Sequence, residues 1–361
     1  MEITTFLRTA VDNGASDIFI ISGLKPSFKL NGLIVPEGDE VVMSEKANLL
    51  VKELYALASR PMEKFMETGD DDFSLSLKGM SRFRISTYRQ RGSLAAVIRV
   101  VRFDLPDFKL LGIPDEVLTI ADKTRGIVLV TGPAGSGKST TLAYIVDEIN
   151  KSRNAHIITI EDPIEYLHKN KLGVVSQREI NVDTDSYVTA LRACLRQAPD
   201  VILLGEMRDL ETIRIAMTAA ETGHLVISTL HTVGAVNTID RVVDVFPPNQ
   251  QQQVRIQLSM ILQTVVSQQL LPSEDGQLLP VFEIMHLNNA IRNMIRESKT
   301  HQIDAVIQSS SSEGMISMDA SILSLFKQEK ISSETALKYA YNVDQIERRI
   351  ENIAGIKKVF G

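Results

Sequence analysis

The sequence predicts an α/β protein with two domains: a small α+β domain, followed by a larger domain built on a parallel sheet. Length is the first observation, because 361 residues are enough for roughly two domains that each bury a core. The second is a change of pattern near Leu118, from short alternating segments to continuous apolar runs separated by helical segments. Such runs predict strands buried on both faces of a parallel sheet. The third is a glycine-rich loop that joins one run to a helical segment.

The expected small domain covers residues 1–101 and opens with an amphipathic helix and a strand. Asn31 and Gly32 lie between two apolar segments and predict a hairpin, because Asn-Gly adopts the positive-φ turn that fits the twist of paired strands. Helical spacing covers 44–67. Two segments that alternate apolar and polar residues predict half-buried strands, and the apolar segment 94–101 closes the domain.

The expected linker covers residues 102–117, which hold two prolines and a glycine. The second domain is then expected over 118–361, with its strands at GIVLV, HIITI, VILLG and LVIST. Helical spacing dominates after Asn249, so we expect a helical region from there to the end of the chain.

A phosphate-binding loop is predicted at GPAGSGKS, which fits G-x-x-x-x-G-K-[ST] between a strand-like and a helix-like segment. Its glycines let successive N–H groups and a helix N-terminus point at one anion. Lys138 would reach the β- and γ-phosphates, and the Ser139 hydroxyl would coordinate Mg²⁺. The expected nucleotide-binding residues are Gly132, Pro133, Ala134, Gly135, Ser136, Gly137, Lys138, Ser139 and Thr140. The sequence therefore predicts a nucleoside triphosphate site.

Two acidic sites follow strand-like runs, Glu161-Asp162 after HIITI and Glu206 after VILLG. The carboxyl ends of strands are where ligands gather in α/β sheets, so these acids are candidate metal or water ligands. Glu206 is the better candidate for the general base, and Glu161 is the alternative. Ordinary helix N-capping, by Asp162 or Asp209, is the competing explanation.

Gly205 stands where many phosphate-loop enzymes place a metal-binding aspartate. Mg²⁺ would then depend on Ser139, the phosphates and water, which suits an ion that keeps much of its hydration shell.

Histidines and arginines complete the candidate site. His224 and His231 bracket the strand-like LVISTL, and one of them could position the γ-phosphate unless both are structural. Their spacing does not suit a metal site. Arg82, Arg84 and Arg99 belong to an arginine-rich end of the first domain. They form either a solvated sheet face or a set that reaches nucleotide on the second domain of the same or a neighbouring subunit.

Composition excludes several classes of protein. A net charge of -6 and a pI near 5.6 argue against a nucleic-acid binder. The single cysteine, Cys194, cannot form an internal disulfide and is expected to be a small buried hydrophobe. The apolar runs are shorter than the ~20 residues of a membrane span, and the first residues do not form a signal peptide. We therefore expect a cytoplasmic protein.

Five motifs follow one another along the chain: the phosphate loop, ITIEDPIEY, APDVILLGEMRD, TGHLVISTLHT and then AIRNMIRE at 290–297. In this order the chain resembles the AAA-like ATPases of the type IV pilus and type II/IV secretion superfamily, and within it the pilus retraction ATPases. The assembly ATPases of that superfamily usually carry a four-cysteine zinc site and a longer N-terminal extension, and this sequence has neither.

The resemblance implies a homohexamer in which a PAS-like N-terminal domain packs on the RecA-like ATPase domain of the next subunit. It implies ATP and Mg²⁺ as cofactors, and a motor that powers pilus retraction and twitching motility. Its partners would be a platform protein of the inner membrane and a paralogous retraction ATPase, with no nucleic acid. The motor would lie at the inner face of the cytoplasmic membrane, at the pilus base.

The same resemblance assigns roles to individual positions. Glu161 and Glu206 would serve hydrolysis, and His224 and His231 would form a catalytic or coupling pair. Arginines of the N-terminal domain would contact phosphate. The residues expected to serve retraction rather than hydrolysis are Ala290, Ile291, Arg292, Asn293, Met294, Ile295, Arg296 and Glu297. An accessory ATPase subunit that modulates another motor is the main alternative, and a RecA-like nucleic-acid translocase is the remote one.

Overall fold

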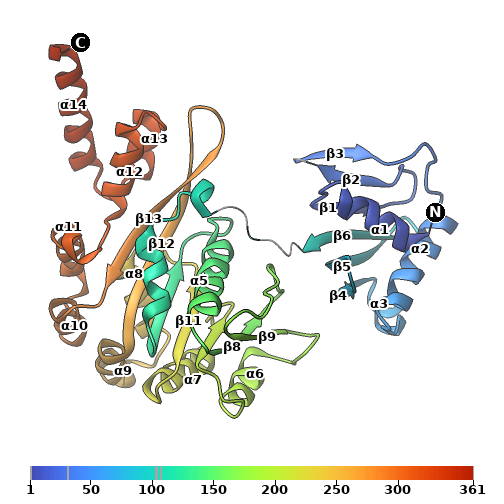
Figure 1. Cartoon of the computed structure of the whole chain (residues 1–361), viewed down its shortest axis with the longest axis horizontal. Helices are drawn as coiled ribbons and strands as arrows, with labels where there is room; N and C mark the ends of the chain where they lie inside the picture. The colour runs from blue at the N-terminus through green and yellow to red at the C-terminus, as the bar shows by residue number, and fades with distance from the viewer. Residues whose placement is uncertain (1, 31, 102–104, 106–107, 361) are drawn as a thin grey trace. The chain divides into compact units, whose positions relative to one another are not determined.

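The computed structural model describes residues 2–30, 32–101, 105 and 108–360. The chain folds as two compact units (Figure 1). The first comprises residues 1–104 with the short segments 163–167 and 181–183, and the second comprises the rest of the chain. The predicted fold class, α/β with an α+β first part, is confirmed.

The first unit is a six-stranded antiparallel sheet in the order β3-β2-β1-β6-β5-β4. The strands are β1 Asp17–Ile20, β2 Ser27–Leu30, β3 Leu33–Pro36, β4 Asp70–Leu77, β5 Ser81–Gln90 and β6 Ser93–Val101. The helices are α1 Ile3–Asp12, α2 Ser44–Leu57 and α3 Glu63–Thr68. As predicted, β2 and β3 form a hairpin, although Asn31 itself lies outside the described residues.

Strand β5 shows why the sequence alternates in this unit. Phe83 and Ile85 are fully buried in the core beneath α1 and α2, whereas Arg82 and Arg84 lie half-buried on the other face. Because successive side chains of a strand point to opposite faces, this register places the arginines together, as the sequence predicted.

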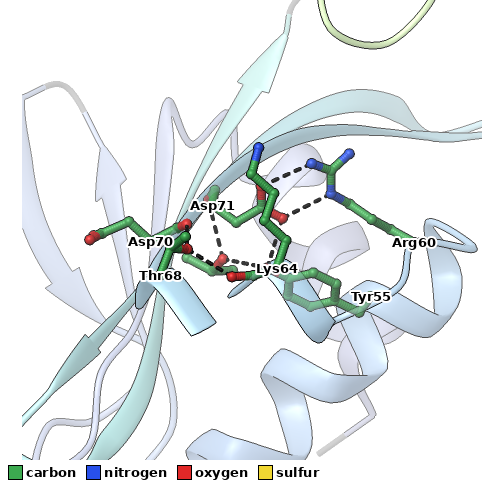
Figure 2. A network of polar contacts seen from close by, with 7 residues as sticks. Tyr55, Arg60, Lys64, Thr68, Asp70 and Asp71 are labelled. Atoms are coloured by element: carbon green, nitrogen blue, oxygen red, sulfur yellow. Dashed lines mark hydrogen bonds and ion pairs between the residues drawn. The ribbon is translucent and has the colours of Figure 1, made fainter. Parts of the chain in front are cut away.

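A network of polar contacts joins α2 and the residues after it to β4 and β5 (Figure 2). The Arg60 guanidinium donates two hydrogen bonds to the Asp71 carboxylate, at 2.8 and 2.9 Å, and the Tyr55 hydroxyl donates a third at 3.0 Å. Tyr55 also meets the Thr87 hydroxyl at 2.8 Å. Burial acts to raise the pKa of Asp71, but the bonds from Arg60 and Tyr55 outweigh it and hold that pKa below its ordinary value.

The second unit is a seven-stranded sheet in the order β13-β12-β7-β11-β10-β8-β9, in which only the edge strand β13 is antiparallel to its neighbour. The strands are β7 Gly126–Thr131, β8 His156–Glu161, β9 Val174–Glu179, β10 Val201–Leu204, β11 Leu225–Leu230, β12 Leu262–Pro272 and β13 Leu278–His286. The four predicted apolar runs are therefore the four adjacent parallel strands β7, β11, β10 and β8.

Helices cover both faces of this sheet (Figure 1). They are α4 Asp115–Leu118, α5 Lys138–Ser152, α6 Tyr187–Cys194, α7 Leu210–Glu221, α8 Ala235–Asp244, α9 Pro248–Ile261, α10 Asn289–Arg296, α11 Ile303–Ser309, α12 Met318–Lys327, α13 Ser333–Tyr339 and α14 Val343–Phe360. Helices α4 and α5 pack on one face and α6 to α9 on the other. Among the described residues, none of these helices combines the length and apolarity that a membrane span requires.

The expectation of an all-helical region after Asn249 is wrong for residues 262–286, which form the β12–β13 hairpin. The segment holds the β-branched run Thr264-Val265-Val266, whose backbone pairs with β7. Its polar neighbours Gln268 and Ser267 are buried against the same sheet. Tertiary pairing therefore overrides the apparent helical spacing.

Part of the expected linker belongs to the second unit. Residues 102–104 and 106–107 lie outside the described residues. Beyond them, Ile113 and Val117 are buried and pack with Ile145 of α5. The compact second unit consequently begins before Leu118, where the sequence pattern changes.

Candidate nucleotide-binding site

The phosphate loop joins β7 to α5. Gly137 precedes α5 with φ +88°, and Gly132 follows β7 with φ +143°. A side chain on Gly132 would lie 2.1 Å from the carbonyl oxygen of Gln268, so no other residue fits there. The loop can thus bring its backbone close to a ligand at the N-terminus of a helix of 15 residues.

Two polar side chains in this loop suit a phosphate ligand. The Lys138 ammonium is buried and donates to the carbonyl oxygens of Gly132 and Pro133, each at 2.9 Å. The Ser136 hydroxyl is 2% exposed and has no hydrogen-bond partner among the described residues. A buried hydroxyl without a partner is costly, and an anion in the loop would satisfy it. The residues present therefore fit a nucleotide phosphate.

The acidic candidates and His231 lie at the same edge of the sheet as the loop, because β7, β8, β10 and β11 are parallel and each of these residues follows or ends its strand. Glu206 follows β10, and its Oε2 lies 2.7 Å from Nε of Arg208 and 3.6 Å from Nε2 of His231. These three residues and Arg241 line a cavity of about 400 Å³. A carboxylate beside an open cavity can accept a proton from water.

Glu161 ends β8 in a more enclosed setting. Its Oε1 accepts hydrogen bonds from the Thr159 hydroxyl at 2.6 Å and the Gln177 amide at 3.2 Å. Asp209 accepts from the N–H and hydroxyl of Thr212 and begins α7, so helix capping explains Asp209. Glu161 and Asp209 are thus held by donors of the protein, whereas Glu206 lines the cavity.

The sequence did not reveal Tyr187 as part of this region. A side chain on Gly205 would lie 2.8 Å from the Tyr187 hydroxyl and 3.4 Å from the Cα of Glu161. A side chain at this position would clash with the Tyr187 hydroxyl unless that ring moved, which favours the glycine found where many phosphate-loop enzymes place an aspartate. Burial raises the pKa of Tyr187, and the charges of Glu206, Asp162 and Glu161 raise it further, so its hydroxyl stays neutral.

Other predicted site residues lie elsewhere. His224 precedes β11 and contacts the carbonyl of Ala219 at 2.9 Å, so the six residues of the strand separate it from His231 by about 20 Å. Within one chain only His231 joins Glu206. Arg82, Arg84 and Arg99 are in the first unit: Arg99 is paired with Asp17 at 3.0 Å and Arg82 donates to Ser76 at 3.3 Å. Arg84 and Arg99 are opposite each other on β5 and β6.

The segment 290–297 forms most of α10. Ile291 and Ile295 are fully buried, and Met294 packs against the same core, so these three share one face as predicted. Asn293 is exposed, as are Ala290, Arg296 and Glu297. Only that exposed face is available to a partner.

The fold and the site define a P-loop ATPase: a glycine-rich loop between a parallel strand and a helix, with an acid directly after β10, from which β7 is separated by β11 alone. The chain belongs to the type II/IV secretion system protein family, whose profile matches residues 2–302.

Known relatives resemble almost the whole chain. The type IV pilus retraction ATPase PilT of Pseudomonas aeruginosa is 43% identical over 341 residues, 94% of this chain and 98% of that protein. The type IV pilus ATPase PilU of the same organism is 36% identical over 97% of this chain and 92% of its own length. A crystal structure of the pilus retraction motor PilT with bound ADP has a TM-score of 0.88 and 44% identity, covering 96% of this chain and 99% of that one.

Proposed function

We propose that this chain is a motor ATPase that hydrolyses ATP to power type IV pilus retraction, and with it twitching motility. The observation that carries the proposal is a phosphate loop together with a carboxylate that faces a cavity, in a chain that is similar over nearly its whole length to a pilus retraction ATPase. A protein that only binds nucleotide has no need of an acid that faces an open cavity at the same edge of the sheet as the phosphate loop.

Lys138 binds the β- and γ-phosphates in this mechanism, and leaves the loop carbonyls of Gly132 and Pro133 to do so. The loop N–H groups and the Ser136 hydroxyl accommodate the remaining phosphate oxygens. The lost bonds to two carbonyls are replaced by stronger contacts with an anion.

Glu206 is the residue that accepts the proton of the attacking water, and His231 lies where it can orient that water or the γ-phosphate. Arg208 pairs with the Glu206 carboxylate, and because its side chain is 72% exposed it can swing away at little cost. Glu161, bound to Thr159 and Gln177, supports this site rather than acting as the base.

Mg²⁺ would be held by Ser139 and water, and would neutralise charge on the phosphates. Gly205 leaves no carboxylate at the usual second position, and the Tyr187 hydroxyl lies next to it. The Thr140 side chain, next to Ser139, belongs to the same end of α5.

We further propose a homohexamer in which Arg82, Arg84 and Arg99 supply positive charge to nucleotide bound by a neighbouring subunit. Domain boundaries at 1–101 and 118–361, with a linker at 102–117, belong to this proposal with one change, which is that Ile113 and Val117 of the linker pack with the second domain. His224 would act at a subunit boundary rather than beside Glu206, since the strand β11 separates it from His231.

The motor would act at the inner face of the cytoplasmic membrane, at the pilus base, with the platform protein as its membrane partner. The exposed face of α10, which includes Asn293 and Arg296, is the part of the 290–297 segment that can serve retraction. Substitutions there test retraction, whereas substitutions of Ile291 or Ile295 test folding, because both are buried.

A second candidate function is that of an accessory ATPase subunit, favoured by the similarity to PilU along 97% of this chain. A nucleic-acid translocase is not favoured, given the net charge of -6.

The deciding experiment measures Mg²⁺-dependent ATP hydrolysis per subunit against protein concentration, without nucleic acid. A site completed by a neighbour's arginines gives a specific activity that climbs with concentration and levels off as rings assemble. Activity that is independent of concentration calls for a measurement of particle size, because preassembled rings behave in the same way. The absence of hydrolysis at every concentration would favour the accessory subunit.

A further inference from the structure

The segment 231–234, which links β11 to α8, is anchored to the two strands that the sequence did not predict. The Gly234 N–H donates to the Ser267 hydroxyl of β12 at 2.9 Å, and the Ala235 N–H donates to the Glu283 carboxylate of β13 at 2.8 Å. All four residues are buried. Because the first N–H groups of a helix have no partner within it, these two bonds determine where α8 begins.

The other end of this segment carries His231, 3.6 Å from Glu206. Between the two ends, the Thr232 and Thr238 hydroxyls lie 2.8 Å apart, and the Thr238 hydroxyl donates to the Gly234 carbonyl at 2.7 Å. The segment is thus bonded to the first turns of α8 as well as to the sheet. A displacement of Gly234 would be passed on to His231.

Tyr341, which lies between α13 and α14, packs directly on this anchor. A methyl group on Gly234 would lie 3.5 Å from Cε2 of the Tyr341 ring. Although 43% of the Tyr341 surface is exposed, burial around its hydroxyl raises the pKa of Tyr341, and a hydrogen bond with the Ser267 side chain partly opposes that rise. The N–H groups of Tyr341 and Asn342 donate to the Asp319 carboxylate of α12, at 2.7 and 3.0 Å. The C-terminal helices therefore hold Tyr341 against the segment.

Gln268, which follows Ser267 in β12, contacts the phosphate loop and the start of α5. The Gln268 side chain accepts from the Thr141 hydroxyl of α5 at 2.7 Å, and its carbonyl lies against Gly132. Ser267 and Gln268 therefore connect β12 to both halves of the ATPase site. The contacts of Tyr341 described above, with Gly234 and with Ser267, are on the side of the segment that carries His231.

We propose that Tyr341 is a positioning residue for ATP hydrolysis, acting with Ser267 and Glu283 to keep His231 beside Glu206. The inference rests on the hydrolase activity proposed above and adds that turnover depends on the docking of the C-terminal helices. Because the phosphates are bound by the other half of the site, removal of Tyr341 slows the chemical step and leaves nucleotide affinity nearly intact.

The test compares three variants of the full-length protein in steady-state hydrolysis and in ADP binding. Tyr341→Ala removes the ring and is expected to lower kcat about tenfold, with KM and the Kd for ADP within about twofold of wild type. Tyr341→Phe keeps the ring and is expected to lose only about two- to threefold in kcat. Tyr339→Phe, in the same helical region, is the matched control and should behave as wild type.

Two outcomes of the kinetics would overturn the inference. One is a wild-type kcat in Tyr341→Ala. The other is an equal fall in kcat and ADP affinity together with a lower Tm, which would mean that the whole unit has loosened.

Amide hydrogen exchange of residues 231–235 in nucleotide-free protein tests the same inference without hydrolysis. Exchange at Gly234 and Ala235 should be faster in Tyr341→Ala and unchanged in Tyr339→Phe. Equal exchange in all three proteins would refute the role of Tyr341 in holding this segment, whatever the rate of hydrolysis. Faster exchange in Tyr341→Ala, combined with no hydrolysis by the wild type, would refute only the proposed function.

Discussion

Two carboxylates, one in each unit, are paired with an arginine in contrasting ways. Asp71 in the first unit is 5% exposed at its side chain, and both of its oxygens accept hydrogen bonds from Arg60, with Tyr55 adding another. Glu206 in the second unit is 20% exposed and meets an arginine that is 72% exposed. The first pair has one arrangement available to it, while the second borders a cavity and can separate. The two pairs contain the same kinds of group, so the difference between them lies in burial and in the number of bonds.

The largest effect is expected from Glu206→Gln, which keeps the shape of the side chain and removes its basicity. We expect kcat to fall about 10²- to 10⁴-fold, while ATP binding persists. Steady-state hydrolysis and nucleotide binding on the same sample measure both. Glu161→Gln is the matched comparison and should cost much less; a larger loss in Glu161→Gln would reverse the assignment of the base.

Arg60→Ala tests the buried ion pair between Arg60 and Asp71. It strips the buried Asp71 of two bonds, and we expect the free energy of unfolding of the first unit to fall by about 2 kcal/mol. Calorimetry of the full chain measures this, with Lys25→Ala as control, because Lys25 only meets an exposed Asp39 at 3.6 Å.

The loss of stability in Arg60→Ala should also depend on pH. The pKa of Asp71 is lowered in the folded protein, so its contribution exists above the ordinary value of 3.8 and disappears as the pH falls through the lower, folded value. The difference between Arg60→Ala and wild type should therefore shrink in acid. A difference that grows in acid would mean that Asp71 is not the partner that matters.

Glu283 extends the comparison to a buried carboxylate that forms no ion pair with any of the described residues. Burial raises its pKa to about 7, with Asp304 and Asp319 contributing in the same direction, against the bonds from Ala235 and Met318. Glu283 lines a cavity together with Tyr341 and Asp344. The folded state therefore prefers the protonated acid, and this contribution to stability is lost as the pH rises from about 4.5 through 7.

Glu283→Gln removes that titration while keeping a carbonyl for the Ala235 N–H. We expect the wild type to lose about 2 kcal/mol more than the variant between pH 5 and pH 8.5. Thermal unfolding at a series of pH values measures the slope, and parallel curves for the two proteins would contradict the prediction.

The smallest effect is expected from Arg208→Ala. Because Arg208 is largely exposed, its removal should change the free energy of unfolding by less than about 0.5 kcal/mol. Calorimetry alongside Arg60→Ala makes the comparison direct. A loss as large as that of Arg60→Ala would show that the Glu206 pair is as rigid as the Asp71 pair.

Features encoded by consecutive residues could be predicted from the sequence. The phosphate loop, its strand and helix, and Glu206 each follow from a short run whose chemistry is local. The alternation of Arg82 and Arg84 with buried Phe83 is equally local, because a strand repeats every two residues.

Features that depend on pairing between distant segments could not be predicted. Strands β12 and β13 exist because β7 and β12 pair across the sheet, and the chain between them gives no signal of that neighbour. The contact of Tyr187 with Gly205, and of Ser267 with Gly234, joins residues of different elements in the same way. Gly205, at the position where many phosphate-loop enzymes place an aspartate, was the one sign in the sequence that space is short there.

Cys194 offers a practical route into these questions. It is the only cysteine of the chain, it is fully buried in α6, and burial raises its pKa to about 11, so it is a poor nucleophile at neutral pH. A single new cysteine at an exposed site such as Ala290 would therefore take a thiol-reactive dye selectively. Fluorescent reporters can follow α10 and other elements through the ATP cycle without first removing a native thiol.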